Sequence, residues 1–137
     1  MNDNMTTPAG VTDTSPSTST RGGLIAASKV TGTSVYDLKE EKVGSVDDVM
    51  IDKISGRVAF AVLSFGGFLG IGEKYYPLPW ASLRYDTRLD GFVVAIDAAM
   101  LQDAPSYTRG ESVNWADEAY GRRVYDYWKV TPDYYAL

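Results

Sequence analysis

Short runs of hydrophobic residues, separated by turns, dominate the middle of the chain. The run Arg57–Phe65 is apolar on both faces, which is typical of a central strand that is covered on each side. About six such runs within about 65 residues predict a small, mainly β, antiparallel barrel rather than a helical fold. The runs are residues 33–37, 43–51, 57–65, 75–79, 80–85 and 91–96.

Three local patterns refine this prediction. The apolar positions of 43–51 do not alternate cleanly, and Gly44 is placed where a bulge re-phases a strand. The segment 52–56 opens with Asp and closes with Gly, which predicts a hairpin loop whose last residue has a positive φ. Two prolines confine the strand 75–79 to an edge or an end of the sheet.

Helical patterns follow the strands. Asp97 is placed to cap a short helix over 98–101, which Pro105 ends. Asn114 is the expected cap of a longer helix that Pro132 prevents from continuing. The helical spacing on one side of it involves Ala116, Tyr120, Val124, Tyr127 and Trp128. We therefore expect a tail at 1–23, a barrel domain at 24–97 and a helical, aromatic-rich extension at 98–137.

The tail 1–23 has a different composition. It has nine Ser or Thr residues between Thr6 and Thr20, and it has no aromatic residue. Such a segment buries too little apolar area to offset the entropy of ordering, so we expect disorder. It lacks the charged and apolar regions of a secretory signal, and no stretch of the chain approaches the ~20 apolar residues of a membrane span. We expect a cytoplasmic protein.

The composition narrows the chemistry. The chain has no cysteine and no histidine, which removes thiolate and imidazole catalysis and the usual zinc ligands. Its net charge of -5 has the wrong sign for gripping a phosphate backbone. Asp47, Asp48 and Asp52 suggest a metal, but neighbouring residues of a strand point to opposite faces and cannot share one ion without a bulge. We therefore expect no metal, no cofactor and no enzymatic activity; a small enzyme built from carboxylates and tyrosines is the alternative.

The segment 65–74 combines glycines with large apolar side chains. It is not a phosphate-binding loop, because Glu73 occupies the lysine position and prolines follow where a helix is needed. Its apolar residues either cover one mouth of the barrel or bind a partner, and both roles coexist if a second subunit completes the cover. These residues are Phe65, Phe68, Leu69 and Ile71.

Eight of the thirteen Tyr and Trp residues lie between Tyr107 and Tyr135, interleaved with arginines. This pattern is found in base-stacking surfaces, in helices packed on a core and in protein interfaces. The negative net charge disfavours nucleic acid, and the other two interpretations remain open. The candidate interaction surface comprises Phe65, Phe68, Leu69, Ile71, Trp80, Trp115, Tyr120, Tyr127 and Trp128.

Four segments resemble successive strands of the PRC-barrel family: 32–37, 42–52, 56–67 and 76–80. The family is named for the cytoplasmic domain of the photosynthetic reaction-centre H subunit, and it includes a domain of a ribosome maturation factor. The resemblance covers about residues 27–96, and the region after Ala104 resembles the extension of stand-alone bacterial members. It implies a β-barrel used as a docking or assembly surface, with no catalytic residues.

The chain departs from both named relatives. The H subunit has a transmembrane helix where this chain has a polar tail, and the maturation factor has a further N-terminal domain. We therefore expect a soluble, non-enzymatic adaptor or assembly module that forms a homodimer and docks on an unidentified protein partner. The alternative is an RNA- or ribosome-associated processing or assembly factor, which the net charge disfavours.

Overall fold

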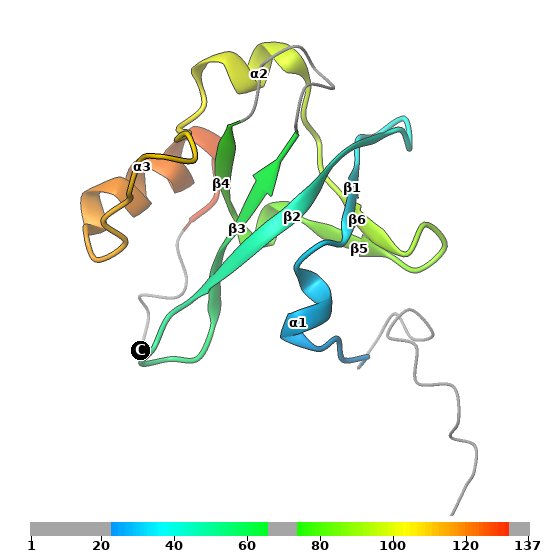
Figure 1. Ribbon diagram of the computed structural model, residues 1–137, viewed down its shortest axis with the longest axis horizontal. Coiled ribbons are helices and arrows are strands. Elements are labelled where there is room, and N and C mark those ends of the chain that lie inside the picture. The colour runs from blue at the N-terminus through cyan, green and yellow to red at the C-terminus, as the bar shows by residue number, and fades with distance from the viewer. Residues whose placement is uncertain (1–22, 66–73, 132–137) are drawn as a thin grey trace, which may run out of the picture.

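The computed structural model describes residues 23–65 and 74–131 (Figure 1). Within them, a six-stranded sheet is followed by helices, so the mainly β class with a C-terminal helical region is confirmed. The elements are α1 (Ala27–Val30), β1 (Ser34–Tyr36), β2 (Lys42–Ile51), β3 (Val58–Ser64), β4 (Tyr75–Pro79), the short 3-10 helix η3 (Trp80–Ser82), β5 (Arg84–Asp86), β6 (Gly91–Val93), α2 (Ala98–Asp103) and α3 (Glu118–Trp128).

The sheet order is β4-β3-β2-β1-β6-β5. Two features of the predicted antiparallel barrel are wrong. First, β1 and β6 pair in parallel, with Val35 opposite Phe92, while the other neighbours are antiparallel. Second, β4 and β5 are the two edges, so hydrogen bonds among the described residues do not close the sheet. Local patterns predict strands but carry no information on which distant strands meet, and this explains both errors.

The irregular spacing in β2 reflects bulges. The pairing with β1 shifts between Val35 and Tyr36 and skips Val43. Val43 is therefore the extra residue of this bulge, one position before the predicted Gly44. A glycine is needed at position 44 for a different reason: the backbones of β2 and β3 approach so closely there that a Cβ would overlap the carbonyl oxygen of Ser64. A second shift follows Val46 and is centred on residue 47.

This second bulge changes the geometry of two carboxylates. The register passes from Val46 to Asp48 and skips Asp47, and both Asp side chains are exposed. The strand is therefore bulged at this point, the one condition under which two neighbouring Asp side chains of a strand could approach a single ion. Among the described residues, no group of three or more acidic side chains is positioned to hold a metal ion.

The core fills the space inside the curved sheet. β3 is buried along its middle, as its apolar sequence predicts, and Leu101 of α2 joins the same cluster. β4 is an edge strand, as its prolines predict, yet all of its residues are buried. Tyr75 and Tyr107 exchange backbone hydrogen bonds of 2.8 and 3.0 Å on its outer side, and α3 packs on it. The C-terminal region therefore protects this edge.

Of the two predicted helix caps, one is confirmed and the other is wrong. Asp97 caps α2 as predicted, since its carboxylate accepts a hydrogen bond of 2.8 Å from the amide of Met100. The predicted cap of the longer helix, Asn114, is wrong. Asp117 caps α3 by accepting from the amide of Ala119 at 3.0 Å, while Asn114 accepts from Ala116 in the preceding turn.

Candidate functional site

The β2–β3 hairpin ends in a turn held by polar contacts. The Asp52 carboxylate accepts a hydrogen bond of 2.8 Å from the Ser55 amide, and the Gly56 amide donates to the Asp52 carbonyl at 2.8 Å. Gly56 has φ 79°, which confirms the predicted hairpin loop with a final positive φ. Hydrogen bonds from the Ser55 side chain and amide also lower the pKa of Asp52. These contacts fix the backbone of the turn and therefore the position of Ile54, between Lys53 and Ser55.

The side chain of Ile54 on this turn is 81% exposed. Its neighbour on β2, Ile51, is 50% exposed, and Met50 is half-buried. Together they form one wall of a groove of about 540 Å³, which we call the hairpin groove. The hairpin groove is lined by Met50, Ile51, Asp52, Lys53, Ile54, Ala59, Phe60, Trp115, Ala116 and Glu118.

Aromatic rings form the floor and the second wall of the hairpin groove. The ring of Trp115 lies 5.6 Å from that of Phe60, and Tyr125 of α3 meets Phe60 edge-on at 5.3 Å. The Tyr125 hydroxyl donates a hydrogen bond to the carbonyl of Ala59, which is itself part of the lining. These rings are thus packed in place before anything binds, and such rigid aromatic surfaces anchor protein interfaces at a small entropic cost.

The rim of the hairpin groove carries charges of both signs. Lys53 and Asp52 lie on the turn, and Glu118 lies at the start of α3, where its carboxylate is 3.4 Å from the guanidinium of Arg122. A negative side chain in the first turn also complements the helix dipole. The rim therefore does not present the continuous positive surface that binding to nucleic acid needs.

Two residues of the predicted interaction surface belong to the main core. Phe65 is only 2% exposed and meets Tyr76 edge-on at 5.5 Å. Trp80 is half-buried and meets Phe92 edge-on at 5.5 Å. Phe68, Leu69 and Ile71 lie outside the described residues.

The four predicted residues of the C-terminal region pack on the sheet and on one another. Tyr127 and Trp128 are edge-on at 5.2 Å, and the Tyr127 hydroxyl donates to the carbonyl of Met100. Tyr120 lies between the ring of Trp115, at 5.9 Å, and the guanidinium of Arg123. Trp115 alone among them lines the hairpin groove. The structure therefore separates the predicted surface into core residues, helix-packing residues and one groove residue.

Of the ten residues that line the hairpin groove, only Trp115 was in the predicted surface; the three large apolar side chains on or beside the hairpin turn, Met50, Ile51 and Ile54, were not predicted. A detectable signal was present, because Ile54 is a large apolar residue inside a polar, Gly-terminated hairpin loop. Such a residue has little local reason to be there, and exposed apolar side chains that gather at one place mark interaction sites. The contribution of Trp115 could not be found in this way, since it depends on how α3 packs against β3.

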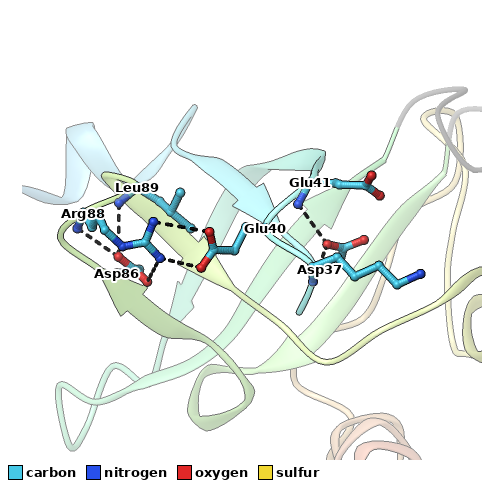
Figure 2. A network of polar contacts seen from close by, with 7 residues as sticks. Asp37, Glu40, Glu41, Asp86, Arg88 and Leu89 are labelled. Carbon is cyan, nitrogen blue, oxygen red and sulfur yellow. Dashed lines mark hydrogen bonds and ion pairs between the residues drawn. The ribbon is translucent and has the colours of Figure 1, made fainter.

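The opposite end of β2 is closed by a polar network (Figure 2). The guanidinium of Arg88 binds both carboxylate oxygens of Glu40, and the pKa of Arg88 is raised mainly by this contact. Asp86 accepts hydrogen bonds from the amides of Arg88 and Leu89. The Arg88 and Glu40 side chains are 63% and 49% exposed, so the ion pair contributes little stability. The network joins the β1–β2 and β5–β6 turns.

The sheet and the groove define a small β-rich domain with a surface suited to binding protein. A family model for the PRC-barrel domain matches residues 22–101, more than half of the chain, so the chain belongs to the PRC-barrel family. PRC-barrel domains are in general protein-interaction modules. No curated protein matches the sequence. The part of the chain that the structure describes contains no helix long and apolar enough to cross a membrane.

Proposed function

We propose that the chain is a non-enzymatic docking module that self-associates and binds a protein partner through the hairpin groove. The exposure of Ile54 on a turn fixed by Asp52 carries this proposal. Covering this side chain, which is 81% exposed among the described residues, gives about 25 cal/mol for each Å² of apolar surface removed from water. The adjacent ring of Trp115 supplies the kind of anchor that dominates binding energy at interfaces.

The other candidate activities find less support. Acid catalysis needs a carboxyl group with a raised pKa, whereas hydrogen bonds lower the pKa of both Asp52 and Glu111. Binding to RNA needs a basic surface, whereas the net charge is -5 and the groove rim carries Asp52 and Glu118 beside Lys53. Retention of RNA on a filter at low salt would favour the RNA-associated alternative over docking on protein.

Light scattering at micromolar concentration tests the self-association. We expect a dimer, and we expect Ile54→Asp to weaken it by about tenfold or more, because a carboxylate in an apolar contact is costly. Leu24→Asp is the matched control, since Leu24 is 88% exposed and does not line the groove. A strictly monomeric wild-type chain, or a dimer that Ile54→Asp leaves unchanged, would overturn self-association through the groove.

Affinity capture with the full-length chain tests docking on another protein. A specific partner is expected to be retained by the wild type and by Leu24→Asp, and to be lost with Ile54→Asp. Equal retention by both variants would place the docking surface elsewhere on the domain. The comparison depends on matched surface substitutions, so it separates a groove contact from non-specific adhesion.

A further inference from the structure

The chain reverses direction at the end of α3 (Figure 1). Lys129 has a left-handed backbone with φ 60°, and the Val130 amide donates a hydrogen bond of 3.0 Å to the carbonyl of Tyr125. Val130 packs against the cluster of Ala59, Phe60 and Tyr125. Two members of that cluster, Ala59 and Phe60, also line the hairpin groove, although Val130 itself does not.

Residues 132–137 are long enough to reach the hairpin groove. α3 has 11 residues and is therefore about 16 Å long. The groove lies at the N-terminal end of α3, where Trp115 and Glu118 line it. Six residues in extended conformation span about 20 Å. A chain that has already turned back at Lys129 can therefore return along the whole of α3 and enter the groove.

The chemistry of this segment matches the groove. Its sequence is Pro-Asp-Tyr-Tyr-Ala-Leu, with three large apolar or aromatic side chains among six residues. Tyr134 and Tyr135 are suited to a site with an apolar floor and an open rim, since each ring has a polar end. Asp133 carries the charge opposite to that of Lys53 on the rim.

The other segments outside the described residues are less suitable occupants. Residues 1–22 contain no aromatic side chain, and their Ser and Thr residues offer little apolar area to the groove. Residues 66–73 follow β3, and the seven residues of that strand separate them from the hairpin. The segment 132–137 therefore best satisfies both reach and composition.

We propose that residues 132–137 bind in the hairpin groove of the same chain and compete there with the protein partner. The inference rests on the proposed function in one respect, which is that the partner uses this groove. A ligand that needs the open groove binds with an affinity reduced by the fraction of molecules in which the groove is open. If the segment fills the groove in nine of ten molecules, partner binding is about tenfold weaker than to the open groove.

Cysteine pairs test this contact directly, because the natural sequence has no cysteine. Ile54→Cys combined with Tyr135→Cys in the full-length chain is expected to form a disulfide within one chain under mild oxidation. The matched control combines Leu38→Cys with Tyr135→Cys. Leu38 is 66% exposed but lies at the opposite end of β2, whose ten residues span about 33 Å. Formation is expected to be at least about tenfold slower in this control.

Mass spectrometry and non-reducing gels give the outcome. Failure of the 54–135 disulfide to form faster than the control overturns the inference, and so does a disulfide that forms only between two chains. Ile54 and Leu38 are both at exposed turn positions, so neither substitution removes a core contact. Circular dichroism of the reduced proteins checks that each pair folds as the wild type does.

A second variant separates this inference from the proposed function. Tyr134→Ser with Tyr135→Ser is expected to strengthen dimer formation or partner binding up to about tenfold, because the competing segment loses its aromatic side chains. Unchanged binding by this variant overturns the competition, even where Ile54→Asp still abolishes association. A 54–135 disulfide in a chain that shows no association at all supports the segment contact and overturns the docking function.

Discussion

The hydroxyl of Tyr125 donates a hydrogen bond to the carbonyl of Ala59, a residue 66 positions earlier in the chain. Ala59 lies at a register shift, because Met50 pairs with Phe60 and Ile51 pairs with Val58. It is also outside the β3–β4 register, so neither neighbouring strand includes it in the ladder. The hydrogen bond from α3 therefore satisfies a carbonyl that the sheet bypasses, at the wall of the hairpin groove.

Tyr125→Phe is expected to lower the free energy of unfolding by about 1–3 kcal/mol, because it leaves this buried carbonyl unsatisfied. Urea denaturation at neutral pH measures the change. Tyr36→Phe is the control, since the structure shows no hydrogen bond of the Tyr36 hydroxyl among the described residues, and we expect a change within about 0.5 kcal/mol. Equal effects of the two substitutions would contradict the assigned role.

Gly44→Ala is expected to destabilise the domain by about 1–3 kcal/mol or more. A Cβ at this position overlaps the carbonyl oxygen of Ser64 and meets the ring of Phe65, so β2 and β3 would have to separate. Gly110→Ala is the matched control, because a Cβ at that position has no neighbouring atom within 4 Å. Thermal unfolding of both variants gives the comparison, and a tolerated Gly44→Ala would show that the strands adapt.

Stability is expected to fall between about pH 10 and 12 because of Tyr107. Burial raises its pKa to about 12, and the negative charge of Asp47 adds to the effect. Its pKa in the unfolded chain is about 10, so the unfolded state releases the proton first as the pH rises. The stabilisation is therefore complete below pH ~10 and is lost as the pH passes through the folded-state value.

Tyrosinate absorbance during an alkaline titration measures this directly. The wild type is expected to show ionisation close to pH 12 that Tyr107→Phe removes in part. Tyr85 is expected to contribute similarly, because burial and its hydrogen bond to Asp90 also raise its pKa to about 12. Ionisation of all tyrosines in a single step near pH ~10 would contradict both assignments.

Asp52→Asn is expected to loosen the hairpin turn, seen as faster hydrogen exchange of the Ser55 amide. The pKa of Asp52 is lowered by its hydrogen bonds from Ser55, so the folded turn favours the carboxylate. That contribution is present above about pH 4 and is lost as the pH falls through the lowered pKa. Asp47→Asn serves as the control, and equal protection of the Ser55 amide in both variants would contradict the prediction.

The parts of the fold that local patterns control could be predicted from the sequence. The loop 52–56, the buried strand β3 and the cap at Asp97 each follow from a few neighbouring residues. Asn114 and Asp117 are both good capping residues, so the sequence alone could not decide between them. Asp117 follows Trp115, whose ring packs 5.6 Å from that of Phe60, and this contact between distant parts of the chain is not visible in the sequence.

The site was harder to predict for the same reason. Trp115 was included in the predicted interaction surface because many Tyr and Trp residues lie close together in its part of the sequence. It does line the hairpin groove. Phe65 and Trp80 were included because they too are large aromatic residues, but Phe65 is buried in the core and Trp80 packs against it. Ile54 belongs to the groove yet stands among polar residues, so a search for apolar clusters passes over it. Apolar content alone does not distinguish a residue that packs inside from one that faces outward.

The parallel pairing of β1 with β6 has a consequence for the order of folding. The hairpins β2–β3, β3–β4 and β5–β6 join neighbours in sequence, whereas Val35 meets Phe92 only after nearly the whole sheet has been traversed. Closing such a long loop is entropically costly, and contacts of high sequence separation slow folding. We therefore expect docking of the β5–β6 hairpin onto β1 to be a slow step of folding, which would make the three-residue strands β1, β5 and β6 important for the folding rate.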